Sequence, residues 1–396
     1  MKSGIKFFCL LLLASLWLPA LAQTQEKGFN FTTVTDLKTT PVKNQQRTGT
    51  CWSFATTSFI ETELLRMKKG EYDLSEMYFA RYCYLDKADR YVRRSGTANF
   101  GAGGQAHDVM NVVRKYGFVT DTSYTGMKSE YTFAKGDPDK TLKKYLDVVM
   151  KKKNDTISSV WKDSFNTYLD TYLGNLPSKI MVNNSSLDPV AFEKSTGFNP
   201  DNYIEITSYN HVPFYKQVMI DIQDNWSQDL YYNLPIDETV EVIKSALKNG
   251  YSVCWDGDVS DRGFSHRNGV AIAPQTDVKL LEGTEKEIWE KISDKDRSSQ
   301  MYSFTGPVPE KKVTQEDRQK SFDIQQTTDD HLMHFIGIVT DQNGTIYFKT
   351  KNSWNANSNK FGGYLNMSEA YVRLNTIAIM VHKNAIPKAI STKLGL

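Results

Sequence analysis

Cys51 is the residue whose type and position are best suited to covalent chemistry. The residues after it, 52–67, are apolar at mostly helical spacing without proline or glycine, and Gly70 supplies a stop signal. This pattern places Cys51 at the N-terminus of a helix. The positive end of the helix dipole and its free N–H groups lower the pKa of a thiol, and the thiolate is the reactive nucleophile. The sequence therefore predicts a nucleophilic cysteine.

A nucleophilic cysteine needs a base, and two of the six histidines stand out by context. His331 and His334 begin an apolar segment that is expected to form a strand, and the next strand is expected to end at Asn352. The Asn-Gly pair at 343–344 predicts a two-residue hairpin turn, which brings that amide back beside an imidazole. An amide there fixes the tautomer and orientation of the ring. Because the two histidines are an odd number of residues apart, only one can face Cys51.

Gln45 lies six residues before Cys51 and carries a side-chain amide. Together with the backbone N–H of Cys51, this amide could donate to the negative oxygen that forms when a thiolate attacks a carbonyl. Loss of one such donor typically raises the reaction barrier by about 3 kcal/mol. The alternative is a loop glutamine that makes ordinary backbone contacts, and the spacing alone leaves both interpretations open.

The elements that must position these residues are expected as helices first and strands later. Helices are expected at 52–67, 107–116 and 237–247, and residues 74–81 are expected to begin another, with Ser75 as its cap. Strands are expected at 203–207, 217–220, 252–255, 335–339, 346–350 and 363–367. This segregation favours an α+β fold over an alternating α/β fold. Residues 127–200 are rich in Lys, Asp, Asn and Ser, and are expected to be a surface insertion rather than a second domain.

Two motifs resemble the papain superfamily of cysteine peptidases. The first motif resembles the segment that carries the family's nucleophile; here it reads Pro41-Val-Lys-Asn-Gln-Gln-Arg-Thr-Gly-Thr-Cys-Trp-Ser-Phe-Ala55. The second resembles the family's asparagine-and-tryptophan motif; here it reads Lys351-Asn-Ser-Trp354. The resemblance implies a papain-like fold, with a helical N-terminal half packed against a strand-rich antiparallel half and the active-site cleft between them.

The same resemblance implies a role for each motif residue. Cys51 is the implied nucleophile, Gln45 the oxyanion donor, and Asn352 the group that orients the imidazole under a Trp354 lid. The family's catalytic histidine stands six residues before a strand glycine, which selects His331 over His334. Asn355 replaces the glycine that usually follows the tryptophan, so the turn there is expected to differ while the orienting amide stays in place.

Further segments resemble the bleomycin hydrolase and aminopeptidase C branch of this superfamily. They are Leu74-Ser-Glu-Met-Tyr-Phe79, Gly103-Gly-Gln105, Asn210-His-Val-Pro-Phe214 and Val253-Cys-Trp-Asp-Gly-Asp-Val259. This branch implies an aminopeptidase that cleaves peptides without a cofactor, and a homo-oligomer, hexameric in the family. Gly103 and Gly104 are expected to wall a pocket for a substrate side chain.

Aminopeptidases of this branch use a C-terminal arm whose carboxylate holds the substrate's free amine in the cleft. Here the sequence ends in Ala-Ile-Ser-Thr-Lys-Leu-Gly-Leu396, without the longer tail expected from those relatives. An open-cleft endopeptidase is therefore the first alternative. An acyltransferase or amidase shares the chemistry up to the acyl-enzyme and is a second alternative. A catalytically inactive binding protein is disfavoured, because all four expected catalytic residues are present.

The first 22 residues have the three-part pattern of a secretory signal. Lys2 and Lys6 precede an apolar run at 7–18, and cleavage is expected after Ala22, which leaves a peptidase domain at 23–396. The run is shorter than a membrane-spanning helix, so no stable membrane anchor is expected and the protein should be periplasmic or extracellular.

Charge and cysteine content exclude several other classes of protein. Forty-eight basic against 46 acidic residues give a net charge of +2, so nothing indicates nucleic acid as a partner. The mature part keeps three cysteines, Cys51, Cys83 and Cys254, an odd number that does not form a disulfide framework. No spacing of histidines and cysteines suits zinc, so neither a metal nor a cofactor is expected.

Overall fold

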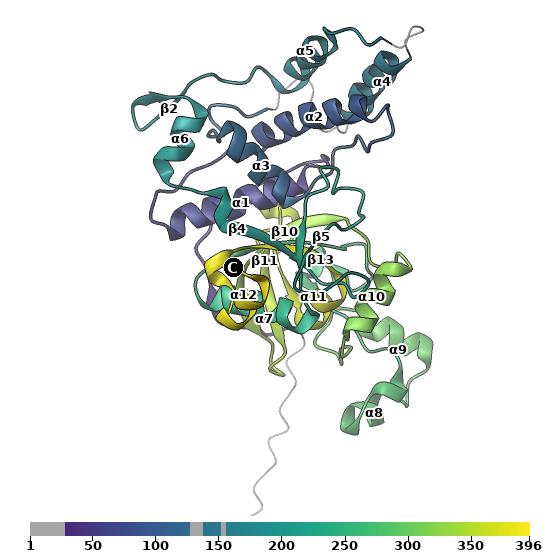
Figure 1. Ribbon diagram of the computed structural model, residues 1–396. Helices are drawn as coiled ribbons and strands as arrows, with labels where there is room; N and C mark the ends of the chain where they lie inside the picture. Colours follow the sequence, from purple (N-terminus) through teal and green to yellow (C-terminus); the bar gives the residue numbers. More distant parts are fainter. Residues whose placement is uncertain (1–27, 127–137, 152–155) are drawn as a thin grey trace, which may run out of the picture.

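The computed structural model describes residues 28–126, 138–151 and 156–396, and the predicted signal peptide lies outside them. A layer of helices from the first half of the chain lies on one face of a large sheet, and later helices cover the other face (Figure 1). The architecture is α+β, as the sequence predicts. No helix within the described residues is long and apolar enough to cross a membrane.

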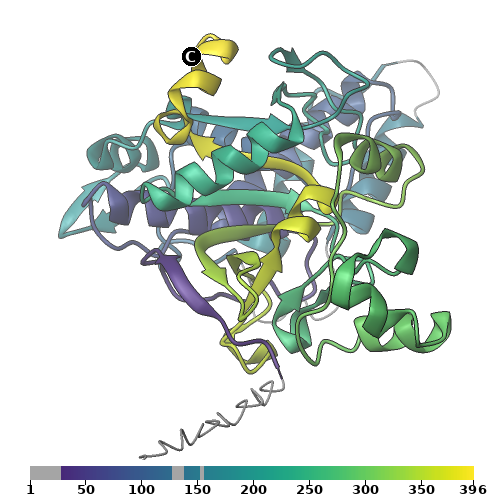
Figure 2. The same cartoon turned by 90° about the horizontal axis from the view of Figure 1, so that it is seen from below.

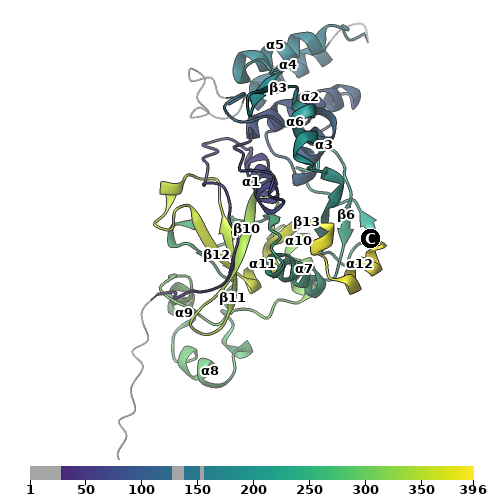
Figure 3. The ribbon, with the colours of Figure 1, turned by 90° about the vertical axis from the view of Figure 1, so that its left-hand side faces the viewer.

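Three helices form the centre of the helical half: α1 (Cys51–Arg66), α2 (Glu76–Arg93) and α3 (Ala106–Tyr116). Ser75 caps α2 by accepting a hydrogen bond from Tyr78 N at 3.1 Å, and Gly117 ends α3 with φ +68. Figure 3 shows α1 between the other helices and the sheet. Because α1 is covered on both sides, fourteen of its sixteen residues are buried.

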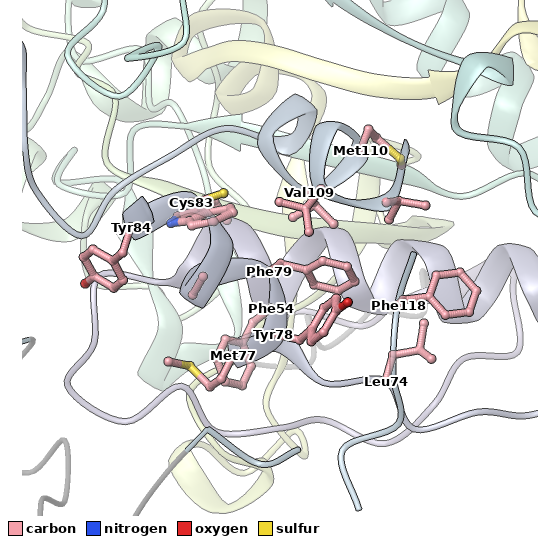
Figure 4. Packing of buried hydrophobic residues seen from close by; sticks show 14 of the residues in the cluster. Phe54, Leu74, Met77, Tyr78, Phe79, Cys83, Tyr84, Val109, Met110 and Phe118 are labelled. Carbon is pink, nitrogen blue, oxygen red and sulfur yellow. The ribbon is translucent and has the colours of Figure 1, made fainter. Parts of the chain in front are cut away.

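The apolar core of this half joins α1, α2 and α3. Figure 4 shows Phe54 of α1 packed near Met77 and Phe79 of α2, with Val109 of α3 and Phe118 closing the cluster. These side chains are at most 5% exposed. Each removes a large apolar area from water, so the core fixes the direction of α1 and with it the position of Cys51.

The predicted insertion forms further helices on the outer side of α2, away from the sheet (Figures 1 and 3). Its described elements are α4 (Asp139–Met150), α5 (Trp161–Leu173), the hairpin of β2 (Ile180–Val182) and β3 (Ser185–Leu187), and α6 (Pro189–Thr196). Leu146 and Phe165 are fully buried and belong to the same apolar cluster as Phe54 and Phe79. The described part of the segment therefore extends the helical half and shares its core.

The sheet has eleven strands, in the order β5-β6-β4-β13-β7-β10-β11-β12-β9-β8, with β1 also paired to β10. The strands are β1 (Thr32–Asp36), β4 (Tyr203–Thr207), β5 (Gln217–Val218), β6 (Tyr231–Asn233), β7 (Val253–Gly257), β8 (Phe264–Ser265), β9 (Val270–Ala271), β10 (His331–Thr340), β11 (Ile346–Lys351), β12 (Tyr364–Ser368) and β13 (Thr376–His382). Most pairs are antiparallel, while β4 with β6 and β9 with β12 are parallel.

Strands β10 and β11 form the predicted hairpin, but its turn is not the predicted two-residue turn. Thr340 pairs with Ile346, so five residues connect the strands. Asp341 closes this loop because its Oδ1 accepts hydrogen bonds from the N–H groups of Asn343 and Thr345, both at 2.9 Å. The aspartate side chain thus adds to a backbone turn in which Gly344 N donates to the Asp341 carbonyl at 3.0 Å. The hairpin still returns the chain toward residue 352.

The opposite face of the sheet is covered by α7 (Ile236–Lys248), α11 (Glu369–Asn375) and α12 (Lys388–Leu394). Figure 2, seen from this side, shows α7 lying across the sheet. Ile390 and Leu394 of α12 are buried in the same cluster as α7, and Lys393 pairs with Glu238 at 2.6 Å. The described C-terminal residues therefore lie against α7.

Three more helices lie at one side of the molecule (Figure 1): α8 (Gly283–Trp289), α9 (Asp294–Met301) and α10 (Gln315–Asp323).

Candidate active site

Cys51 is the first residue of α1, where the sequence places it. Thr50 occupies the N-cap without a side-chain bond to the helix, so its hydroxyl is free to meet Thr48 Oγ1 at 2.6 Å. Thr48 Oγ1 also contacts the carbonyl oxygen of Gln45 at 2.7 Å, which closes the loop before the helix. Cys51 is only 8% exposed. The thiol thus sits at the positive end of a helix dipole in a largely dry environment.

Gln45 is held in one orientation by contacts on both ends of its amide. Its Nε2 donates to the Thr48 carbonyl at 2.9 Å, and its Oε1 accepts from Ser353 Oγ at 2.6 Å. Its backbone N–H also donates to the Ser353 carbonyl at 2.8 Å. An amide nitrogen has two hydrogens, so one N–H remains beyond the bond to Thr48. The geometry is compatible with a donor fixed beside Cys51.

His331 and Asn352 meet as the hairpin predicts. His331 Nε2 lies 2.9 Å from Asn352 Oδ1, which also accepts from Ser353 N at 2.7 Å. Because Oδ1 can only accept, the ring must carry its hydrogen on Nε2, which leaves Nδ1 as an unprotonated acceptor. The Trp354 ring lies over the imidazole with 4.8 Å between centroids, as the predicted lid requires. The imidazole is therefore held in the tautomer that a general base needs.

Burial sets the charge state of both reactive groups. It lowers the pKa of His331 to about 4, although the bond to Asn352 acts in the opposite direction. Burial also raises the pKa of Cys51 to about 12, while a hydrogen bond from the Leu332 backbone opposes this shift. Leu332 directly follows His331, so the sulfur lies against the start of β10. Burial thus outweighs the helix N-terminus, which was expected to lower the pKa of the thiol, and it opposes the charged form of both groups.

His334 lies in a different environment from His331. Its Nδ1 is 2.9 Å from Ser58 Oγ in the middle of α1, and its side chain is completely buried. The Lys351 ammonium also donates to Ser58 Oγ, at 2.8 Å. His334 is thus a core residue that joins α1 to β10, whereas His331 lies at the beginning of that strand beside Asn352.

The two glycines of the predicted side-chain pocket have different surroundings. A Cβ on Gly104 would lie 2.8 Å from Asp108 Oδ2 and 2.9 Å from the Trp52 ring, so this glycine is needed for close packing. A Cβ on Gly103 would lie only 1.9 Å from Asp224 Oδ2. Gly103 is half-buried and Gly104 is buried. The carboxylate of Asp224 therefore covers Gly103.

Comparison with known proteins shows the family. Residues 29–244, more than half of the chain, match the family described as papain family cysteine protease, and residues 298–395 match the peptidase C1-like family. The chain belongs to the papain family of cysteine proteases.

Asn355, which replaces the expected glycine after Trp354, has φ +77, a left-handed conformation that asparagine tolerates better than most residues.

The similar proteins include bacterial aminopeptidases and a yeast proteinase. Aminopeptidase G of Lactobacillus delbrueckii subsp. lactis is 21% identical over 394 residues, covering 89% of this chain and 83% of that protein. Aminopeptidase W of the same organism is 22% identical over 420 residues, covering 96% and 88%. Cysteine proteinase 1, mitochondrial, of Saccharomyces cerevisiae is 32% identical over 111 residues, 24% and 23% of the two chains.

A solved structure shows the same fold. The crystal structure of pepw from Lactobacillus rhamnosis HN001 superposes with a TM-score of 0.70 and 18% sequence identity, covering 92% of this chain and 84% of that one. Such a score over most of both chains confirms the papain-like architecture.

The papain-family site also contains charged groups that the motifs do not include. The carboxylates of Asp224, Asp256 and Asp329 all act on the Cys51 thiol and raise its pKa, after burial. Asp329 stands two residues before His331, and Asp256 lies inside the segment 253–259. Their proximity in sequence to these motifs was the signal that could have identified them. Their approach to Cys51 depends on tertiary packing.

Proposed function

We propose that this cysteine peptidase is an aminopeptidase that removes N-terminal residues from peptides through a thioester on Cys51. The observation that carries the catalytic assignment is the 2.9 Å contact between His331 Nε2 and Asn352 Oδ1. The Cys51 thiol at the start of α1 accepts a hydrogen bond from the backbone of Leu332, the residue after His331. The named aminopeptidases G and W, which align over most of both chains, support the aminopeptidase assignment.

Each residue has one step in this mechanism. His331 Nδ1 takes the proton of the Cys51 thiol as the sulfur attacks the peptide carbonyl, and the oxygen becomes negative. The Cys51 N–H and the Gln45 amide donate to that oxygen. The C–N bond then breaks, and the imidazolium gives its proton to the departing amine, which leaves a thioester. Water, deprotonated by the same imidazole, releases the acid and restores the thiol.

An endopeptidase is the second candidate, because of where the C-terminal residues lie. In the related aminopeptidases that the sequence resembles, a C-terminal arm closes one end of the cleft. Here α12 and Leu396 pack on α7, on the sheet face opposite to α1. An open cleft would accept peptides that continue past the site in both directions.

The test compares two fluorogenic peptides of one sequence, one with a free amine and one N-acetylated, under reducing conditions. Cleavage of the free-amine peptide alone is expected from an aminopeptidase, and equal cleavage of both from an endopeptidase. Cys51→Ala should abolish cleavage, while Cys83→Ala should not, because Cys83 is a buried thiol beside Asp108. A new amide in place of a free acid would identify an acyltransferase, and activity in Cys51→Ala would overturn the mechanism.

We also propose that the protein is exported and loses residues 1–22. The support is the order of Lys2 and Lys6, the apolar run and Ala22. N-terminal sequencing of the protein from its native cell should begin at Gln23, and a chain that begins at Met1 would contradict export with cleavage. Light scattering of the same sample tests the homo-oligomer that the resemblance implies.

A further inference from the structure

Three carboxylates from separate parts of the chain converge near Cys51. Asp224 lies in the loop between β5 and β6, Asp256 lies in β7, and Asp329 precedes β10. All three act electrostatically on the same thiol, and Asp224 and Asp329 both raise the pKa of Asp256 after burial. Like charges that gather in a poorly hydrated place repel one another, so this arrangement is unfavourable unless a cation joins it.

Asp256 has the strongest need for a partner. It is 3% exposed, and neither of its carboxylate oxygens has a hydrogen bond of normal geometry among the described residues, although Asp329 and the Gln105 amide lie close enough to shift its pKa. Asp256 shares a face of β7 with Cys254, whose sulfur lies 3.6 Å from Thr56 Oγ1 of α1. It also pairs in register with Leu332 of β10. The carboxylate therefore projects toward the beginning of α1, and a buried acceptor without a donor indicates a missing ligand.

The polar groups around this cluster do not neutralise it. Gln105 Nε2 donates to both oxygens of Asp329, at 3.2 and 3.1 Å, and its own Oε1 is buried without a donor among the described residues. The Lys87 ammonium attracts Asp224 while it donates to the carbonyls of Gly101 and Gly103. The contact between Asp256 and Asp329 raises the pKa of the first and lowers that of the second, so these two carboxylates share one proton. Two carboxylate charges then face one ammonium, which leaves an excess of negative charge.

The cluster lies on the thiol side of the site. Asp224, Asp256 and Asp329 all act on the sulfur, whereas the charged neighbours of the His331 imidazole are His266 and Asp330. The imidazole protonates the leaving amine, so groups away from it face the acyl part of the substrate. Among the described residues, no group of three or more His, Cys, Asp and Glu side chains could hold a metal ion. An organic cation with N–H donors fits the carboxylates better.

We propose that Asp224, Asp256 and Asp329 bind a positively charged group of the substrate on the acyl side of the bond that Cys51 attacks. The group is an ammonium or guanidinium, either the free α-amine of the peptide or the side chain of a Lys or Arg residue. This inference rests on the proposed peptidase function and specifies its substrate class. The three carboxylates would then bind the free amine of the substrate themselves, although the described C-terminal residues lie against α7 and not in the cleft.

The first test uses four fluorogenic dipeptide substrates that combine a free or acetylated amine with lysine or norleucine as the first residue. We expect the doubly neutral peptide to have a kcat/KM at least about ten-fold below the best cationic peptide. Asp256→Asn and Asp224→Asn should remove most of this preference. Asp221→Asn, an exposed aspartate three residues before Asp224, is the matched control and should keep it.

The result separates the two sources of the cation. Loss of preference for the free amine assigns the cluster to the α-ammonium, and loss of preference for lysine assigns it to the side chain. Equal kcat/KM for all four peptides in the wild type, or an unchanged preference in both variants, would overturn the inference while the peptidase function stands. Absence of all cleavage would overturn the peptidase function instead.

A second measurement does not depend on turnover. The positively charged reagent 2-aminoethyl methanethiosulfonate and its neutral ethyl analogue both modify thiols. Mass spectrometry gives the rate of each reagent at Cys51 and at a free thiol in solution. The rate of the charged reagent divided by that of the neutral one should be about ten-fold higher at Cys51 than at the free thiol. In a folded Asp256→Asn variant, the rate ratio at Cys51 should fall toward that of the free thiol. Asp224→Asn provides the same test at a less buried position. Equal ratios in the wild type would contradict a cation site.

Discussion

The imidazole of His331 has one hydrogen-bond partner that decides which nitrogen carries the proton. Asn352 Oδ1 takes the Nε2 hydrogen and is itself fixed by Ser353 N, while Asn352 Nδ2 lies 3.3 Å from His266 Nδ1. The amide is therefore held from three sides. A ring without this acceptor could rotate or change tautomer, and Nδ1 would no longer be reserved for the thiol proton.

Asn352→Ala should therefore lower kcat by about 100-fold and change KM little, because it removes orientation rather than substrate contact. Steady-state kinetics on the free-amine peptide provide the measurement. Asn352→Asp keeps an acceptor for Nε2 and should lose less activity. A kcat in Asn352→Ala within about two-fold of the wild type would show that the ring is oriented by other contacts.

The motif residues were predictable because their relations are local, and the carboxylates were not. Cys51 follows directly from its helix signal, and a hairpin joins His331 to Asn352 across 21 positions. Asp256 and Asp224 are ordinary acidic residues in sequence, and only the packing of β7 and the loop after β5 onto α1 gives them a role. The sequence interpretation of Gly103 as a pocket wall missed the carboxylate that covers it.

Strand β10 is the element on which the site depends, since it carries His331 and pairs with β1, β7 and β11. Gly337 allows the closest of these approaches. A Cβ at this position would lie 2.3 Å from the Thr35 carbonyl oxygen of β1. The backbone of an adjacent strand cannot move aside as a flexible side chain can, so any larger residue must separate the two strands.

Gly337→Ala should lower the free energy of unfolding by about 3 kcal/mol or more, measured by urea denaturation. Gly344→Ala in the same hairpin is the matched control. Gly344 has φ +81 but nothing within 4 Å of a Cβ, so it should cost only about 1 kcal/mol of conformational strain. Equal losses in the two variants would mean that backbone contact with β1 is unimportant.

Element prediction failed where the pattern was ambiguous rather than weak. The sequence predicted strands at 252–255 and 335–339, which overlap β7 and β10, but it predicted none at 376–382, where β13 lies. Strand β13 is buried at all seven positions, and a short uniform apolar run does not distinguish a strand from a buried helix. The five-residue turn after β10 was missed because its backbone turn runs from Asp341 to Gly344, and the Asp341 side chain adds two further bonds.

At the scale of the whole molecule, a buried charge pair joins the helical half to the sheet. His107 of α3 contacts Glu205 of β4 through Nδ1, and its Nε2 lies 2.9 Å from Ser227 Oγ. Burial lowers the pKa of His107, but Glu205 and then Asp108 outweigh it and raise the pKa to about 9. The imidazole is therefore charged at neutral pH and holds the two layers together electrostatically.

This link predicts a loss of stability in alkali. The pKa of His107 is about 6.5 in the unfolded chain, so its contribution is complete below pH 6.5 and disappears as the pH rises through 9. The difference corresponds to about 3 kcal/mol. Urea unfolding at pH 6 and pH 9.5 should show this loss in the wild type and much less in His107→Gln. His211→Gln, at an exposed histidine, should behave as the wild type.

The pairing of β1 with β10 sets an order of events during synthesis. Ile338 N donates to Thr35 Oγ1 across 303 positions of sequence. A ribosome adds about 5–20 residues per second, so β1 leaves it roughly 15 to 60 s before its partner exists. The N-terminal strand has no β10 to pair with during that time, and it joins the sheet only after most of the chain has been made.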